Sequence, residues 1–313
     1  MNKAYRIGFL AGDSSVGTGK VLLNSIQRAA ADYGAHFFSF SGGAARPREV
    51  DKETLRKGAR DLFRFINKTN LDGLIVWATS LRYFFLLEEV EEFFSVHHEL
   101  KIVSLSSPIS GAPLISIDNH QGISQIMSHL VKIHGFNKIA FVRALESHPY
   151  AKDRFESYKD SLKKYNLPYH EILVTPPANF SYETGKRAVE ILLDERKLAP
   201  GIDVQAVVNA SDYLAYGMMN ELNRRKIRVP QELVVTGFDD KVEARSASPP
   251  LTTVHIDFTD HGRRAFNVLI DLLNGQEVEN HHLIKNQLIV RQSCGCFIRE
   301  VENVSPSACA QEG

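Results

Sequence analysis

The sequence has little of what marks an exported, membrane-spanning or disulfide-stapled protein. Only three of its 313 residues are cysteine, and all three fall near the end, at Cys294, Cys296 and Cys309. Disulfides therefore cannot hold the body of the fold together. The first apolar run stops before Asp13 and is too short for a signal-peptide core, so we expect a cytoplasmic protein. No window approaches the roughly 18 uninterrupted apolar residues of a membrane-spanning helix.

An excess of charge of one sign is also missing. Lys plus Arg number 37 and Asp plus Glu number 37, so the formal net charge is zero. No overall field draws such a chain to nucleic acid or to anionic lipid, which argues against DNA binding. The composition is otherwise that of a soluble globular protein, with 43% hydrophobic and 24% charged residues. A length of 313 residues favours two lobes or one large α/β unit.

Short apolar runs alternate with longer amphipathic stretches along nearly the whole chain. This alternation predicts β-α-β units and a parallel sheet covered on both faces. The alternation restarts after Gly135, which predicts two similar α/β lobes without a flexible linker between them. The expected strands are 5–11, 36–41, 73–78, 101–105, 114–117, 138–142, 171–174, 205–208, 232–237 and 288–291. The expected helices are 82–97, 120–134, 150–165, 181–195, 212–226 and 257–273.

Residues 12–21 sit between a strand and a helix, where a phosphate-binding loop would lie. The match is incomplete. When the motif is aligned on Lys20, Ser14 replaces its first glycine and Val21 replaces the hydroxyl that binds magnesium. The alternative is a loop of small residues at the carboxyl end of a strand, where open α/β sheets bind many kinds of ligand. We favour the loop and keep a P-loop-like nucleotide hydrolase as a second hypothesis.

The Cys294-Gly-Cys296 pair is a weak metal signal. Two thiolates are half of a tetrahedral zinc site, and the sequence shows no second pair of ligands at a matching spacing. We therefore predict no metal and no cofactor.

Several segments of the second half carry a family resemblance. They are residues 117–122 (Ile-Asp-Asn-His-Gln-Gly), 154–158 (Arg-Phe-Glu-Ser-Tyr), 211–217 (Ser-Asp-Tyr-Leu-Ala-Tyr-Gly), 229–240 (Val-Pro-Gln-Glu-Leu-Val-Val-Thr-Gly-Phe-Asp-Asp) and 248–254 (Ser-Pro-Pro-Leu-Thr-Thr-Val). In this order they resemble the effector-binding core of the lactose-repressor and galactose-repressor family, which has a type I periplasmic-binding-protein-like fold. The last two segments are the most specific. The resemblance covers roughly residues 5–298.

The resemblance implies two lobes joined by three crossovers, near 134–137, 252–256 and 282–287. Lobe one would be 5–134 plus 256–282, and lobe two 136–252 plus 286–298. Residues 299–313 would be a flexible tail or a truncated connection to an output module. A small molecule held in the cleft would bias an open-closed equilibrium. Family repressors begin with a helix-turn-helix, whereas this chain starts at the first strand, so we expect no direct DNA binding by it.

The same resemblance implies which side chains contact the ligand. Arg154 matches the ligand-grasping arginine, whose fork can donate two parallel bonds to hydroxyls or a carboxylate. Asp239 is the matching acceptor, and Phe180 and Phe258 match aromatic residues that face the ligand. Ser211 stands where relatives often carry a contacting asparagine, which predicts a different or water-bridged contact.

The remaining candidates are weaker. Asp118 either contacts the ligand or caps the helix that follows it, because aspartate is among the best N-caps. Asp212 is expected to cap its own helix. Asp13, Ser14 and Ser80 are candidates because they follow strand ends.

The resulting prediction is a non-enzymatic sensing domain for a sugar, sugar derivative or nucleobase, acting without a membrane. It would signal by lobe closure to a fused or partner output domain of a transcription or signal-transduction protein. The aromatic helix 82–97 would pair two copies, so we expect a homodimer. The alternatives are the nucleotide hydrolase and the solute-binding protein of a transporter.

Overall fold

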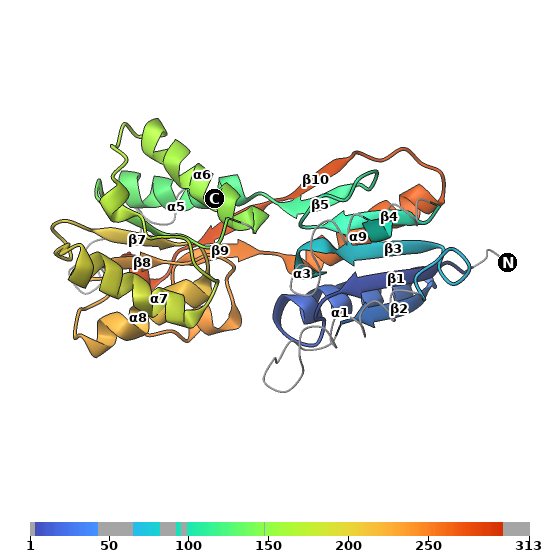
Figure 1. Ribbon diagram of the computed structural model, residues 1–313, viewed down its shortest axis with the longest axis horizontal. Helices are drawn as coiled ribbons and strands as arrows, with labels where there is room; N and C mark the ends of the chain where they lie inside the picture. The colour runs from blue at the N-terminus through green and yellow to red at the C-terminus, as the bar shows by residue number, and fades with distance from the viewer. Residues whose placement is uncertain (1–3, 43–64, 82–91, 95–98, 147, 297–313) are drawn as a thin grey trace. The chain divides into compact units, whose positions relative to one another are not determined.

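The computed structural model describes residues 4–42, 65–81, 92–94, 99–146 and 148–296 (Figure 1). The chain forms two compact units. The N-terminal unit is Met1–Ile117 with Asp257–Ile284, and the C-terminal unit is Asp118–Ile256 with Lys285–Gly313. The chain therefore crosses from one unit to the other three times.

The N-terminal unit is built on a six-stranded sheet with the order β10-β5-β4-β3-β1-β2, in which every pair is parallel. Helices α1 (Gly17–Tyr33) and α9 (Phe258–Leu273) pack against each other and on the sheet. The short helix α3 (Ala78–Leu81) follows β3 directly. The strands are β1 (Arg6–Ala11), β2 (His36–Ser41), β3 (Gly73–Trp77), β4 (Lys101–Leu105), β5 (Leu114–Ile117) and β10 (His281–Ile284).

The C-terminal unit has a parallel three-stranded sheet of order β6-β7-β8 and an antiparallel pair formed by β9 and β11. Its strands are β6 (Ile139–Val142), β7 (Ala206–Asn209), β8 (Val234–Thr236), β9 (Thr253–Ile256) and β11 (Asn286–Ile289). Its helices are α5 (Asn119–Lys132), α6 (Pro149–Lys164), α7 (Tyr182–Val189) and α8 (Asp212–Arg224), with short helical segments η1 (Glu171–Leu173), η2 (Glu190–Glu195), η3 (Val242–Arg245) and η4 (Gln292–Cys294).

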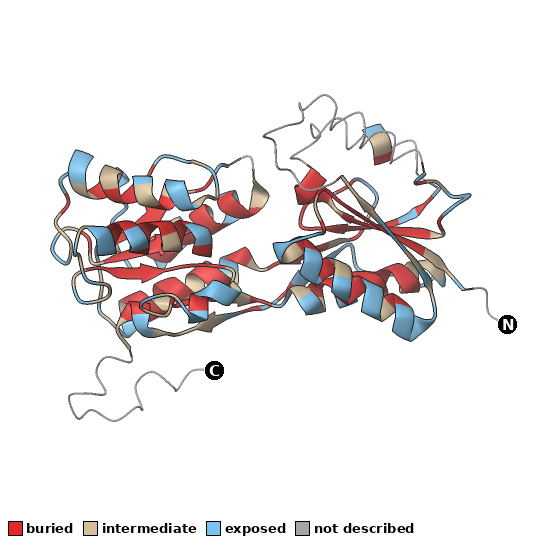
Figure 2. Cartoon of the chain, turned by 90° about the horizontal axis from the view of Figure 1, so that it is seen from below, coloured by how far each residue is buried: buried red, intermediate tan, exposed pale blue. Residues whose placement is uncertain are grey.

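Each unit has its own core. Figure 2 shows the buried residues gathered on the strands and on the inward sides of the helices. Strand β3 is buried along Gly73–Val76, as expected of a parallel strand covered on both faces. In the C-terminal unit α7 and α8 cross at two glycines. A Cβ at Gly217 would lie 1.9 Å from the Tyr182 carbonyl oxygen, and one at Gly185 would lie 2.0 Å from that of Leu214. The two backbones can touch only because both positions lack a side chain.

The α/β architecture predicted from the sequence is confirmed, but several details differ. The strand expected at 171–174 is wrong: Glu171–Leu173 forms a 3₁₀ turn, and only a single bridge joins Val174 to Phe141. Its first two residues, Glu171 and Ile172, are exposed and its last two, Leu173 and Val174, are buried, which is not the alternating burial of a strand with one face covered. The helix expected at 181–195 is α only to Val189 and continues as a π-helix over Glu190–Glu195. Strands β9 and β10 were not predicted, and most of the helix expected at 82–97 lies outside the described residues.

The first crossover also lies earlier than expected. It falls after Ile117 and not near residue 134. The reason is that α5 packs against α6, β9 and β11, which all belong to the C-terminal unit. A helix belongs to the unit whose residues cover its apolar face. The periodicity of α5 shows that it has such a face but not which unit covers it.

Candidate functional site

The carboxyl ends of the C-terminal unit's parallel strands bring the main candidates together. Arg154 lies on α6, which follows β6, while Ala210 and Asp239 follow β7 and β8. This edge of an open α/β sheet is where ligands usually bind. Arg154 and Asp239, which lie far apart in sequence, are in direct contact here.

Arg154 is held on all three of its nitrogens. Its Nε donates to Asn119 Oδ1 at 2.8 Å, one terminal nitrogen donates to the Ala210 carbonyl at 2.6 Å, and the other to Asp239 Oδ1 at 3.2 Å. The guanidinium carbon also lies 3.7 Å from the centre of the Phe238 ring. The residue is only 3% exposed. Burial lowers the pKa of Arg154, and the Asp239 carboxylate opposes that shift. A guanidinium has five N–H groups, so each terminal nitrogen keeps one beyond these bonds.

The loop after β8 places two carboxylates in an unusual backbone conformation. Asp239 and Asp240 have φ angles of 118° and 49°, a region that side-chain-bearing residues rarely adopt. Their backbone N–H groups are held by β9, through the Val254 carbonyl at 2.9 Å and the Thr253 hydroxyl at 3.4 Å. Strain of this kind persists where the surroundings enforce it, and it clusters at functional sites.

Cations accompany these carboxylates. Lys241 Nζ lies 3.7 Å from Asp239 Oδ2. Arg291 donates to Asp240 Oδ1 at 2.6 Å, and His255 Nδ1 lies 3.0 Å from Asp240 Oδ2. Arg291 therefore neutralises Asp240 and leaves Asp239 as the carboxylate that faces Arg154.

A third carboxylate, Asp212, is buried behind this loop. Its two oxygens accept from the Thr253 hydroxyl at 2.6 Å and from the Lys241 backbone N–H at 2.7 Å. Burial, helped by the nearby Asp239 charge, raises the pKa of Asp212 to about 7. The expectation that Asp212 caps α8 is wrong: Ser211 is the N-cap, with its hydroxyl accepting from the Leu214 N–H at 3.5 Å. Asp212, one residue further on, supports the acidic loop instead.

Ser211 and Asp118 both serve as helix caps. Asp118 precedes α5, and its Oδ1 accepts from the Gln121 N–H at 2.8 Å. The capping alternative for Asp118 is thus the one that the structure displays. Both side chains already have a structural partner, which makes them weaker ligand candidates than Arg154 and Asp239.

Phe180 belongs to a row of aromatic rings that leads toward Arg154. Its ring centre lies 5.1 Å from that of His148 in an edge-on contact, and the His148 ring lies 5.6 Å from that of Tyr150. The guanidinium of Arg154 is 6.0 Å from the Tyr150 ring. Phe180 is half-buried.

The other candidates lie in the N-terminal unit, also at strand ends. Ser80 accepts from the Gly12 N–H at 2.9 Å and donates to the Trp77 carbonyl at 2.6 Å, which ties the end of β3 to the loop after β1. In that loop Ser14 is buried, and Asp13 is partly exposed and accepts from the backbone and hydroxyl of Ser15.

Phe258 starts α9 in the same unit, where it is half-buried and stacks on the buried His261 with ring centres 6.2 Å apart. Lys20, the residue on which the nucleotide-hydrolase hypothesis rests, is exposed in the first turn of α1.

Three residues of the Arg154 environment were missed from the sequence: Asn119, Tyr150 and Phe238. A signal existed for Phe238 and Asn119, which stand inside the family segments 229–240 and 117–122, but not for Tyr150. Gly122 explains how Phe238 fits beneath Arg154, because a Cβ at that position would lie 2.6 Å from the ring.

Comparison with known proteins decides the family. Residues 128–294 match the family described as "Periplasmic binding protein-like domain", and this match spans more than half of the chain. The chain belongs to this family. The match runs from α5 through the Arg154 and Asp239 segments to Cys294, and Asp118 lies outside it. It also confirms the fold implied by the sequence resemblance.

Curated relatives in this family are regulators of transcription. The HTH-type transcriptional regulator CelR of Thermobifida fusca is 31% identical over 190 residues, which cover 60% of this chain and 54% of CelR. The HTH-type transcriptional repressor MelR of Bacillus subtilis is 29% identical over 192 residues, with the same coverage. The repressor PurR of Vibrio vulnificus is 26% identical over 237 residues, covering 75% of this chain and 67% of PurR. The chain thus spans about half the length of CelR and MelR.

Several solved structures have a similar fold. The Escherichia coli transcriptional repressor ascG superposes with a TM-score of 0.72 at 22% identity, covering 93% of this chain and 99% of that one. A CelR–cellobiose complex gives 0.73 at 22% identity, covering 93% and 85%. The lac repressor dimer bound to operator gives 0.74 at 20% identity, covering 94% and 82%. In the part of our chain that the structure describes, no helix is long and apolar enough to cross a membrane.

Four possible metal ligands meet elsewhere in the C-terminal unit. The side chains of His129, His134, Cys294 and Cys296 place their ligand atoms within 4.8 Å of one another. The expectation that the two cysteines have no partner pair is therefore wrong. His129 lies on α5 and His134 just after it, far from the cysteines in sequence, so no local spacing could reveal them.

Proposed function

We propose that the chain is a non-enzymatic sensing domain that binds a sugar-like small molecule between its two units. The observation that supports this proposal is the environment of Arg154. The side chain is buried, donates to three acceptors and stacks on the Phe238 ring. One N–H group on each terminal nitrogen is not used by these bonds and can donate to a ligand. An arginine so fixed is pre-organised to grip hydroxyl or carboxylate oxygens at little cost in side-chain entropy. The relatives support this reading, since one solved structure is a CelR–cellobiose complex.

In this proposal each unit supplies one side of the ligand site. Arg154 and Asp239 would bind polar groups of the ligand, and Phe180 would cover its apolar face. Asp13, Ser14, Ser80 and Phe258 would contribute from the N-terminal unit, because they too follow strand ends or begin the helix after a crossover. Asp118 and Ser211 would shape the site through the helices that they cap.

Binding would favour a closed arrangement of the units, and the change would be relayed to an output domain or partner that controls transcription or signalling. Only a ligand that binds one arrangement more tightly can transmit such a signal. We further propose a homodimer, because the lac repressor with the same fold is described as a dimer on its operator. Regulators of transcription act where the DNA is, so we place the protein in the cytoplasm.

The test is thermal unfolding of the purified chain against sugars, sugar acids, nucleosides and purines. A ligand at 100 times its dissociation constant adds about 2.7 kcal/mol of stability, which shifts the melting temperature visibly. We expect one compound class to stabilise the wild type and to bind neither Arg154→Ala nor Asp239→Ala by calorimetry. Arg228→Ala is the matched control, because Arg228 pairs with Glu232 on the exposed surface.

Two results would count against the proposal. If the compound bound wild type and Arg154→Ala with equal affinity, Arg154 would not be part of the ligand site. Stabilisation by magnesium nucleotide alone, abolished in Lys20→Ala, would favour the nucleotide hydrolase. For a confirmed ligand, small-angle scattering should show a smaller radius of gyration with ligand than without it, as closure requires.

A further inference from the structure

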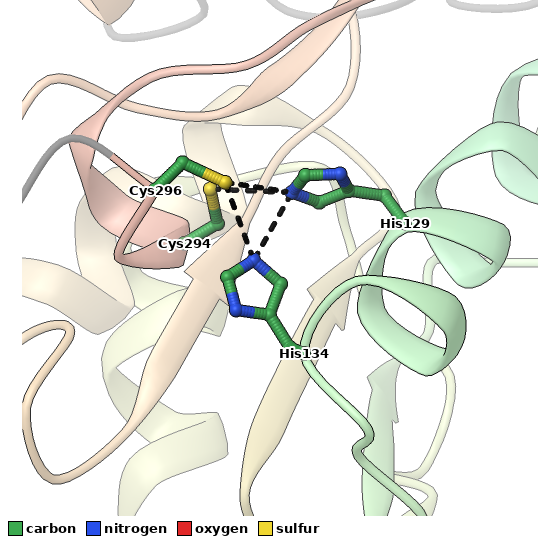
Figure 3. A group of neighbouring side chains, drawn as sticks. All are labelled: His129, His134, Cys294 and Cys296. Carbon is green, nitrogen blue, oxygen red and sulfur yellow. Dashed lines mark hydrogen bonds between the residues drawn. The ribbon is translucent and has the colours of Figure 1, made fainter. Parts of the chain in front are cut away.

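The four side chains His129, His134, Cys294 and Cys296 form a compact group, here called the Cys2His2 cluster (Figure 3). His129 Nε2 lies 3.2 Å from His134 Nε2 and 3.4 Å from each cysteine sulfur. Cys296 Sγ is also 3.4 Å from His134 Nε2. Zinc bonds of about 2.0–2.1 Å to nitrogen and 2.3 Å to sulfur give tetrahedron edges of about 3.3 Å between nitrogens and about 3.6 Å between nitrogen and sulfur. The four distances given above are close to these edges, and all four ligand atoms lie within 4.8 Å of one another.

Hydrogen bonding alone does not account for this arrangement. An imidazole Nε2 has one in-plane direction, occupied either by a hydrogen or by a lone pair. His129 Nε2 nevertheless has three polar neighbours within 3.4 Å. A single hydrogen or a single lone pair cannot form hydrogen bonds with all three. Four donor atoms that all face a common point are arranged as the ligands of a metal ion are.

The backbone shapes the cluster from both sides. On an uninterrupted helix, side chains five residues apart point roughly 140° away from each other. Here α5 ends at Lys132, and His134 lies beside His129 in the turn that follows, just before Gly135 leaves the helix at a φ of 70°. Across the cluster, Gly295 takes a φ of 94°, which lets the chain reverse between the two cysteines.

The turn that carries the cysteines is itself anchored. Ser293 donates its hydroxyl to the Val235 carbonyl at 2.6 Å and accepts from the Thr252 N–H at 2.8 Å. Cys294 is 1% exposed and His129 8% exposed. The thiolate is the form that binds metals.

We propose that the Cys2His2 cluster binds one structural zinc ion. Two thiolates and two neutral imidazoles neutralise a divalent ion, which suits a largely buried site. Loading would release the two thiol protons to water and leave the oxidation state of sulfur and metal unchanged. All four protein ligands close the coordination sphere, which is the pattern of a structural site and not of a catalytic one. The ion would join η4 to the end of α5, segments about 165 residues apart.

The first test is the metal content of the full chain, purified without a polyhistidine tag and without added metal. We expect about one zinc per chain by mass spectrometry of the metals. Cys296→Ser and His134→Ala should each lose most of it. His170→Ala is the matched control, because His170 is exposed and outside the cluster. Equal zinc in wild type and both cluster variants would overturn the site.

Two further measurements on the wild-type protein test the proposal even if a variant folds poorly. Cobalt added to the chelated wild type should give the intense visible bands of tetrahedral coordination and a thiolate charge-transfer band in the near ultraviolet. Weak octahedral bands, or none, would overturn the proposal. A chelator should lower the melting temperature of the wild type by at least about 5 °C and leave that of Cys296→Ser unchanged. A Cys294–Cys296 disulfide in zinc-free protein prepared under reducing conditions would also overturn it.

The zinc site does not depend on the proposed sensing function. Sugar binding can fail while zinc is present, and zinc can be absent while a sugar binds. The two experiments therefore separate the two proposals.

Discussion

Arg154 donates to Asp239 at 3.2 Å, and both side chains are largely withdrawn from water, with exposed fractions of 4% and 15%. The two residues come from α6 and from the loop after β8, and the Phe238 ring lies beneath the guanidinium. Burying two charges costs desolvation free energy, which offsets much of the attraction between them. Removing one partner is therefore strongly destabilising, because the other stays buried and charged without a counter-charge.

We therefore expect Arg154→Met to lower the free energy of unfolding by about 3–5 kcal/mol, because Asp239 is left near Asp212 without its main counter-charge. The double variant Arg154→Met/Asp239→Asn should regain part of this loss. Urea unfolding of the three proteins measures both effects. Arg228→Met, which breaks the exposed pair with Glu232, should change stability little. Similar losses in the buried and exposed variants would refute this account of the pair.

The buried Asp212 predicts a pH dependence of the C-terminal unit. Its pKa rises from 3.8 to about 7 on folding, so between these values the folded unit holds a proton that the unfolded chain has released. Its contribution to stability is thus complete below about pH 4 and is lost as the pH rises through about 7, at up to about 1.4 kcal/mol per pH unit. Asp212→Asn should remove this slope, measured by urea unfolding across that range. The partly exposed Asp271→Asn is the control; an unchanged slope in Asp212→Asn would contradict the assignment.

His261 predicts the opposite dependence in the N-terminal unit. It is fully buried, and its Nε2 donates to the Ile115 carbonyl at 3.0 Å. Burial lowers its pKa from 6.5 to about 4. The unfolded chain therefore binds the proton first, and the contribution of His261, present above about pH 6.5, is lost as the pH falls toward 4.

The chain's single tryptophan, Trp77, ends β3 in the same unit and reports its unfolding by fluorescence. His261→Gln should flatten the loss of stability at low pH, whereas His36→Gln, at an exposed position on β2, should keep it. A wild-type N-terminal unit that is equally stable from about pH 4 to 6.5 would show that His261 remains protonatable when folded.

The crossing of α7 and α8 predicts that Gly217 cannot be replaced. An alanine Cβ would lie 1.9 Å from the Tyr182 carbonyl oxygen, so the helices would have to separate. We expect Gly217→Ala to lower the free energy of unfolding by about 2–3 kcal/mol, although alanine is the better helix former. Asn220→Ala, on the exposed side of α8, is the control and should have little effect. A stabilised Gly217→Ala protein would mean that the two backbones do not touch.

Much of the fold was predictable because its signals are local. The strands at 36–41, 101–105 and 114–117 have the predicted bounds, and α9 starts within one residue of its prediction. The predictions that were wrong concern short segments. Residues 171–174 have strand-like composition, but Glu171–Leu173 form a 3₁₀ turn and Val174 makes only an isolated bridge, to Phe141. Ser211, not Asp212, caps α8 because its hydroxyl is the one that reaches the Leu214 N–H.

By itself, the sequence determined the alternation of strands and helices, the α/β class, and the family segments that carry Arg154 and Asp239. These follow from hydrophobic period and from short motifs, which a single stretch of chain contains in full. Only the tertiary structure decided that α5 belongs to the C-terminal unit, that Asn119 and Phe238 hold Arg154, and that His129 and His134 meet Cys294 and Cys296. Each of these is a contact between distant segments. Such contacts depend on how helix ends, glycine turns and buried faces pack together, and no local pattern records that packing.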